Sequence, residues 1–129
     1  MRNPVLQKFE RRAAKAGSLL CVGLDPEFER IPKRFHRYKL PLFEFSKWII
    51  EQTAEFAAAF KPNTAFFESR GSLGWRELEA TAELLHTQYP DWPVSYTHLD
   101  VYKRQARAGL PGCGSGPGRW RRTAARTEW

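Results

Sequence analysis

Apolar residues in this chain gather in short runs separated by polar, proline-rich or glycine-rich segments. The run Leu19–Pro26 (Leu-Leu-Cys-Val-Gly-Leu-Asp-Pro) is apolar up to its acidic end, which predicts a parallel strand covered on both faces. The run Phe60–Glu68 (Phe-Lys-Pro-Asn-Thr-Ala-Phe-Phe-Glu) has the aromatic, bounded character of a second buried strand. Pro93 and Val94 indicate the start of a third strand.

Apolar residues recur at helical spacing before and between these runs. A short amphipathic helix is expected within Met1–Gly17, ended by its glycine. A second helix is expected after the charged, proline-rich loop Glu27–Pro41, and a third between a cap at Ser72 and a stop at Pro90. The three apolar stripes are Leu6, Phe9, Ala13 and Ala16; Phe45, Trp48, Ile49, Phe56 and Phe60; and Trp75, Leu78, Ala82, Leu85 and Tyr89.

After the first helix, the elements follow the order strand–helix–strand–helix–strand, with about 35 residues between equivalent points, which is the βαβ spacing of an α/β fold with parallel strands. A complete (β/α)8 barrel takes roughly 250 residues, whereas this chain has 129. The pattern therefore accounts for about two of the eight βα units, and it stops near Val94.

The remaining residues, 95–129, have a different character. Ser95–Gln105 resembles a linker-derived translation product, and from Ala106 on, Ala, Arg, Gly and Pro make up 16 of 24 residues. These 35 residues hold seven Lys/Arg against two Asp/Glu, so most of the net charge of +7 belongs to them. With no hydrophobic period to order it, we interpret this segment as a disordered tail that is not native to the protein.

Two side chains are candidates for chemistry. Lys61 is set into an apolar run, where burying its charge without a partner is costly, and Pro62 directly after it interrupts regular pairing. Asp25 stands at the carboxyl end of the first strand, where α/β folds place ligand contacts. The structural alternatives are a strand-end lysine that reaches solvent and a turn-forming Asp-Pro pair.

Taken together, Gly-Leu-Asp-Pro (23–26) and Phe-Lys-Pro-Asn (60–63) closely resemble the bacterial branch of the orotidine 5′-phosphate decarboxylase family, over roughly Val5 to Val94. The resemblance implies that residues 1–94 are the N-terminal portion of a TIM barrel that converts orotidine monophosphate to uridine monophosphate and CO2 in pyrimidine synthesis. It implies that Asp25 and Lys61 bind the substrate's ribose, that no cofactor is needed, and that the intact enzyme is a homodimer.

The family carries an Asp-x-Lys-x-x-Asp array on its third strand, and the array's lysine is the proton donor. Here the nearest match, Asp100 with Lys103, fails because residues three apart on a strand point to opposite faces. We therefore assign no catalytic residue to this chain and expect it to be an enzyme fragment that is inactive by itself.

Other chemistries find little support in the sequence. His36, His86 and His98 are far apart, so no metal site is expected. Cys21 and Cys113 do not form a disulfide framework, which together with the absence of a signal peptide or membrane-spanning run indicates a cytoplasmic protein.

A second reading of a different class remains open. A small basic module could bind nucleic acid through the Arg/Gly-rich tail, in which Trp120 lies among arginines. The linker-like junction at Ser95 and the separation of the charge from the folded part favour the enzyme fragment instead, with no specific nucleic-acid partner and no membrane partner.

Overall fold

The computed structural model of the chain describes residues 3–96. The chain divides into two units, 1–99 and 100–129, and every described residue lies in the first. Residues 97–129 lie outside the described part. They include nearly all of the segment 95–129 that we interpret as a disordered tail and on which the nucleic-acid reading depends. The elements are α1 (Pro4–Ala16), β1 (Cys21–Leu24), η1 (Lys33–Phe35), α2 (Pro41–Thr53), β2 (Ala59–Pro62), α3 (Thr64–Glu68) and α4 (Gly71–Gln88).

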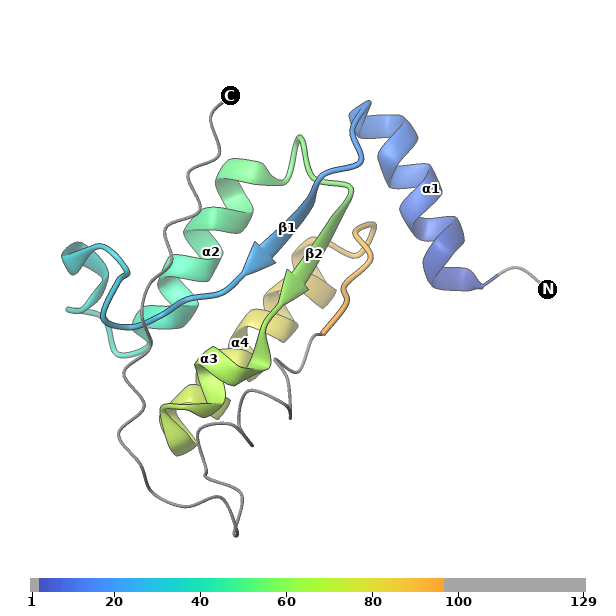
Figure 1. The fold of residues 1–129 in the computed structure, drawn as a ribbon. Helices are drawn as coiled ribbons and strands as arrows, with labels where there is room; N and C mark the ends of the chain where they lie inside the picture. Colours follow the sequence, from blue (N-terminus) through green and yellow to red (C-terminus); the bar gives the residue numbers. More distant parts are fainter. Residues whose placement is uncertain (1–2, 97–129) are drawn as a thin grey trace, which may run out of the picture. The chain divides into compact units, whose positions relative to one another are not determined.

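The strands form the parallel arrangement expected from the sequence (Figure 1). β1 and β2 pair in parallel, with Gly23 opposite Lys61. Phe60 of β2 makes a parallel bridge to Val94 on its other side, where the N–H of Ser95 donates to the carbonyl of Phe60 at 3.0 Å. Val94, where the sequence indicates the start of a third strand, thus forms an isolated parallel bridge beside β2.

One face of this sheet is covered by helices. Leu24 of β1 and Phe60 of β2 are 2% and 0% exposed and pack against Ile50 of α2 and Leu85 of α4. Figure 1 shows α2 and α4 on the same side of the two strands. The hydrophobic core therefore lies between the strands and these two helices, as in one sector of an α/β barrel.

The opposite face of the sheet is open within the described residues. Cys21 and Gly23 of β1 are exposed and Lys61 of β2 is half-buried. The prediction that Leu19–Pro26 is covered on both faces is therefore wrong for this structure: its alternate residues lie on an uncovered face. In a closed barrel this face would line the interior, which remaining strands would enclose.

The N-terminal helix forms as predicted. The side chain of Asn3 accepts a hydrogen bond from the N–H of Val5 at 2.9 Å, and Pro4 occupies the first turn, where its missing N–H costs nothing. Gly17 ends α1 in the left-handed conformation at φ 62°, which favours glycine.

The second helix buries a different face from the predicted one. α2 ends at Thr53, so Phe56 and Phe60, which we assigned to its stripe, lie beyond it, and Phe56 is exposed. Pro41, the last residue of the predicted loop, is instead the first residue of α2, a position that proline favours. The side chains that α2 buries are Pro41, Leu42, Ser46 and Ile50.

The segment predicted as one long strand changes conformation in the middle. Phe60–Glu68 is strand only up to Pro62, and α3 follows it directly. The side chain of Asn63 accepts a hydrogen bond from the N–H of Ala65 at 3.4 Å and so caps α3. Phe67 is fully buried, and it lies in this helix and not in a strand.

The third helix begins earlier than predicted. α4 starts at Gly71, so Ser72 lies inside it and does not cap it, whereas its end at Gln88, before Pro90, is as predicted. Gly74 lies against α3, because a Cβ atom there would fall 1.6 Å from the carbonyl oxygen of Phe67. Only glycine allows this approach of the two helices.

Candidate functional site

Asp25 and Lys61 lie on the same face of the sheet, near the carboxyl ends of neighbouring strands. Lys61 is paired with Gly23, so both residues project to one side. Asp25 follows Gly23 by two residues along an extended segment, and a Cβ on Gly23 would lie 3.6 Å from Oδ2 of Asp25. The parallel register therefore brings together the two residues singled out in the sequence.

Both charges are available for a ligand. Asp25 is exposed and Lys61 is half-buried. Within residues 3–96, neither side chain makes a hydrogen bond or an ion pair. The open face thus presents one anion and one cation at the strand ends, where an α/β fold binds its ligands.

Asn63 is a neutral residue that fixes the backbone next to Lys61 and adds no charge to the site. Its N–H donates to the carbonyl of Leu24 at 3.0 Å, which continues the β1–β2 ladder past Lys61. Its side chain is buried and caps α3. The strand end that carries Lys61 is therefore anchored on both sides, by β1 and by α3.

A buried ion pair that the sequence did not indicate lies between the loops that follow the two strands. Glu77 of α4 is 0% exposed, although Glu79 and Glu83 of the same helix are exposed. Nη1 of Arg70 donates to both carboxylate oxygens of Glu77 at 2.9 and 3.0 Å, and the N–H of Leu42 donates at 2.9 Å.

Desolvation raises the pKa of the Glu77 carboxyl above 4.5, and the hydrogen bond from Leu42 and the charge of Arg70 offset part of this rise. The guanidinium of Arg70 also lies 4.3 Å from the ring centre of Phe28, in the loop that follows Asp25. Arg70 thus connects Glu77 to the loop that follows Asp25.

Arg12 is a second buried charge, and it binds the backbone that precedes β2. It is 6% exposed, and its Nη2 donates to the carbonyls of Ala54 and Glu55 at 2.7 and 3.0 Å. Its guanidinium stacks 4.2 Å from the ring centre of Trp92, whose Nε1 also donates to the carbonyl of Ala54 at 3.1 Å. This cluster attaches α1 to the end of α2.

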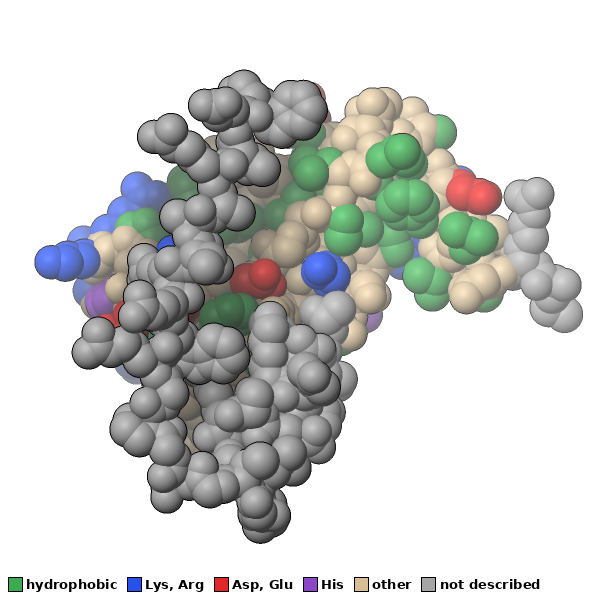
Figure 2. All heavy atoms as spheres, in the orientation of Figure 1, with side chains coloured by type: hydrophobic (Ala, Val, Ile, Leu, Met, Phe, Trp, Pro, Cys, Tyr) green, Lys and Arg blue, Asp and Glu red, His purple; other side chains and the backbone are tan. Residues whose placement is uncertain are grey.

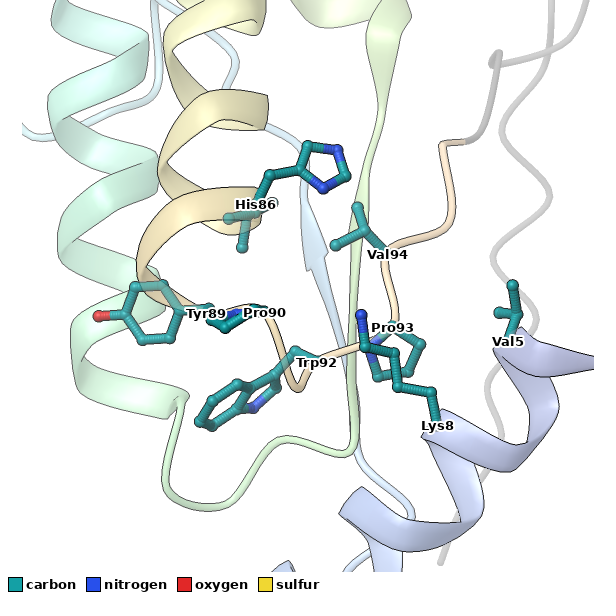
Figure 3. Close-up of a pocket in the computed structure, with 9 residues that line it drawn as sticks. Val5, Lys8, His86, Tyr89, Pro90, Trp92, Pro93 and Val94 are labelled. Carbon is teal, nitrogen blue, oxygen red and sulfur yellow. The ribbon is translucent and has the colours of Figure 1, made fainter.

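A pocket of about 180 Å3 lies beside this cluster and not at Asp25 and Lys61. Figure 3 shows Lys8 of α1, His86 of α4 and the 89–94 segment around it. Its lining includes one lysine and one histidine but no acid. Because these residues precede or begin the third strand, the pocket belongs to the amino-terminal side of the sheet, opposite the candidate site.

Among residues 3–96 there is no group of three His, Cys, Asp or Glu side chains that could hold a metal ion. No helix in the same range is long and apolar enough to cross a membrane. Cys21 is a free, exposed thiol. Asp100 and Lys103 lie outside the described part, as do His98, Cys113 and Trp120.

The curated proteins most similar in sequence that are described here share one enzyme name. No protein-family model matches the chain. An orotidine 5′-phosphate decarboxylase from Leptospira interrogans is 47% identical over 87 residues, which are 67% of this chain and 32% of that protein. The corresponding enzyme from Christiangramia forsetii is 44% identical over 85 residues, 66% of this chain and 31% of that protein.

Solved structures agree with these sequences. A Toxoplasma gondii structure assigned as an orotidine-monophosphate decarboxylase matches with a TM-score of 0.63 and 32% identity, over 79% of this chain and 34% of that one. The orotidine monophosphate decarboxylase of Leishmania donovani matches with a TM-score of 0.57 and 31% identity, over 81% of this chain and 37% of that one.

The chain spans about a third of the length of the curated relatives that it matches. This share agrees with the described elements, which amount to a partial α/β barrel of two paired strands, a bridge to a third, and their covering helices. In sequence and in fold, the described part of the chain is therefore a partial α/β barrel that is similar to about a third of an orotidine 5′-phosphate decarboxylase.

Proposed function

We propose that residues 3–94 supply the first βα units of an orotidine 5′-phosphate decarboxylase, and that Asp25 and Lys61 bind the ribose of orotidine monophosphate. The observation that carries this proposal is the placement of both charges on the open face at the carboxyl ends of adjacent parallel strands. A carboxylate can accept hydrogen bonds from ribose hydroxyls, and an ammonium group can donate to them.

The chemistry expected at such a site is electrostatic. Loss of CO2 from the substrate leaves negative charge on carbon, and fixed charges in a site that excludes water stabilise it without a cofactor. Lys61, held by β1 and α3, would contribute such a preorganised cation and would orient aspartates contributed by later strands. In the proposed whole enzyme, the fragment lies in a cytoplasmic homodimer with a small-molecule substrate and no specific nucleic-acid partner.

A chimera tests the proposal directly. Residues 3–94 of this chain would replace the matching segment of the Leptospira interrogans relative, whose remaining two thirds supply the rest of the barrel. We expect the chimera to decarboxylate orotidine monophosphate, measured as loss of the orotate absorbance. Asp25→Ala and Lys61→Ala should each lower kcat/KM by roughly a hundredfold or more, the scale of losing one electrostatic contact to the transition state.

Matched controls separate site effects from general charge effects. Glu79 and Lys15 are exposed on α4 and α1, so Glu79→Ala and Lys15→Ala remove the same charges away from the open face. They should leave kcat/KM within about twofold. A chimera that is active but insensitive to Asp25→Ala and Lys61→Ala would refute the assignment of the site.

A further inference from the structure

The charges in the described part of the chain are unevenly distributed. Residues 3–96 contain 13 Lys/Arg and 12 Asp/Glu, a net charge of +1. Five of the 13 cations fall in the ten residues 30–39, which contain no acid, so the other described residues hold eight cations against 12 acids. Figure 2 shows Lys and Arg side chains gathered at the end of the molecule that carries η1.

Most of these cations are exposed and not neutralised. Arg30 is paired with Glu27 at 3.5 Å. The other four are exposed and have no ion-pair partner among residues 3–96. They are Lys33, Arg34, Arg37 and Lys39. Four uncompensated charges within seven residues attract anions.

Aromatic rings lie among these cations. The guanidinium of Arg34 lies 4.8 Å from the ring centres of both Phe35 and Trp48, and that of Arg37 lies 5.4 Å from the ring centre of Tyr38. Phe35 is 6% exposed and anchors the group, whereas Trp48 and Tyr38 are 37% and 42% exposed. Guanidinium groups and aromatic rings therefore already lie against one another in this surface.

We propose that this basic–aromatic surface, residues 30–39 with Trp48, binds single-stranded nucleic acid without sequence preference. Lysines and arginines at a surface neutralise phosphates, and exposed rings offer stacking faces that accept any base. An anionic membrane would also attract these charges. Membrane binding, however, favours a continuous apolar helix face, and here the rings are stacked with guanidinium groups instead.

The surface shares no residue with the decarboxylase site. Asp25 and Lys61 lie on the open sheet face, whereas the surface is built from η1 and the exposed side of α2. Binding of nucleic acid can therefore be tested, and can fail, without bearing on the proposed activity.

The test uses the full chain and a fluorescein-labelled oligothymidylate of about 12 nucleotides, within the usual site size of such binders. Fluorescence anisotropy at about 0.15 M salt gives the affinity. Arg34→Gln with Arg37→Gln should weaken binding about tenfold and reduce its salt dependence, because two phosphate contacts are lost. Trp48→Ala should weaken binding about tenfold with no change of charge, because a stacking face is lost.

Matched control variants distinguish binding at this surface from nonspecific electrostatic attraction between the chain and the oligonucleotide. Arg11→Gln with Lys15→Gln removes two exposed charges from α1, and Trp75→Ala removes an exposed ring from α4. Each control should change the affinity by less than about twofold. If Trp48→Ala lowers the helical circular dichroism, the double arginine variant alone decides.

Equal losses in test and control variants would overturn the proposal. So would unchanged binding in the test variants, which would place the contact outside residues 30–48. Tighter binding to vesicles of phosphatidylserine and phosphatidylcholine than to the oligonucleotide, with the same sensitivity to Arg34 and Arg37, would overturn it in favour of a membrane.

Discussion

The carboxylate of Glu77 holds together segments that are remote in the sequence. It accepts hydrogen bonds from Arg70, at the end of α3, and from the backbone of Leu42, at the start of α2. Through the contact of Arg70 with Phe28, it also supports the loop that follows Asp25. One buried charge therefore connects the segments that follow both strands of the candidate site.

Glu77 also makes stability depend on pH. Because its pKa is raised in the folded chain, the folded state binds more protons than the unfolded state above pH 4.5, and this contribution to stability is lost as the pH rises through the raised pKa. The free energy of unfolding of the unsubstituted chain minus that of Glu77→Gln should therefore fall over this range. Urea denaturation at successive pH values measures it.

Glu77→Ala provides the comparison at pH 7. It leaves Arg70 and the N–H of Leu42 without their acceptor, so we expect a loss of about 3–5 kcal/mol, more than for Glu77→Gln, whose amide oxygen can still accept from Leu42. The control Glu79→Ala, on the exposed side of α4, should cost under about 0.5 kcal/mol. If the difference for Glu77→Gln instead rises with pH, attraction to Arg70 outweighs desolvation.

Asp25 and Lys61 could be found from the sequence, but Glu77 could not. The first two stand out because a charge ends or interrupts an apolar run, a signal contained in a few neighbouring residues. Glu77 stands in a helix near other acids, as a solvated residue would, and its partner Leu42 is 35 residues away. Its burial depends on how α2 and α4 pack, which local periodicity does not reveal.

Among the elements, α3 and α4 depend most on a single residue. Gly74 allows the α4 backbone to approach the carbonyl of Phe67, where a Cβ would lie 1.6 Å away. This contact places α4 against α3 immediately after the strand that carries Lys61. The turn between the two helices is correspondingly short, from Ser69 to Arg70.

Gly74→Ala should therefore destabilise the chain, although alanine favours helices by about 1 kcal/mol over glycine. The helices must separate, and we expect a net loss of about 1–3 kcal/mol. Ser72→Ala, at an exposed position of the same helix, should change stability by under about 0.5 kcal/mol. Helical circular dichroism against urea compares the two, and equal midpoints would show that the contact can relax freely.

Element type was predictable where one period persists, and boundaries were not. α1 and the end of α4 follow their glycine and proline signals. Phe60–Glu68 was misjudged because an aromatic run has no period that distinguishes strand from helix, and the cap formed by Asn63 decided the change. α2 was extended too far because Phe56 and Phe60 continue its spacing by chance after Thr53.

At the scale of the whole molecule, we expect the full chain to lack activity on orotidine monophosphate. It spans about a third of its relatives, and no Asp-x-Lys-x-x-Asp array occurs in its sequence. Loss of the orotate absorbance should be no faster with the chain than with buffer, whereas the intact Leptospira interrogans relative provides the positive control. Turnover at ordinary enzymatic rates, about 1 per second or more, would contradict the need for that array.

The free edge of β1 has a consequence for synthesis. Within residues 3–96, β1 pairs only with β2, and in a closed barrel its other edge pairs with the last strand made. In a relative, 87 residues that are 32% of the length leave roughly 180 others, and translating that many at about 5–20 residues per second takes on the order of ten to forty seconds. Throughout that interval the edge can pair wrongly with other nascent chains, and its length of four residues limits how firmly they hold it.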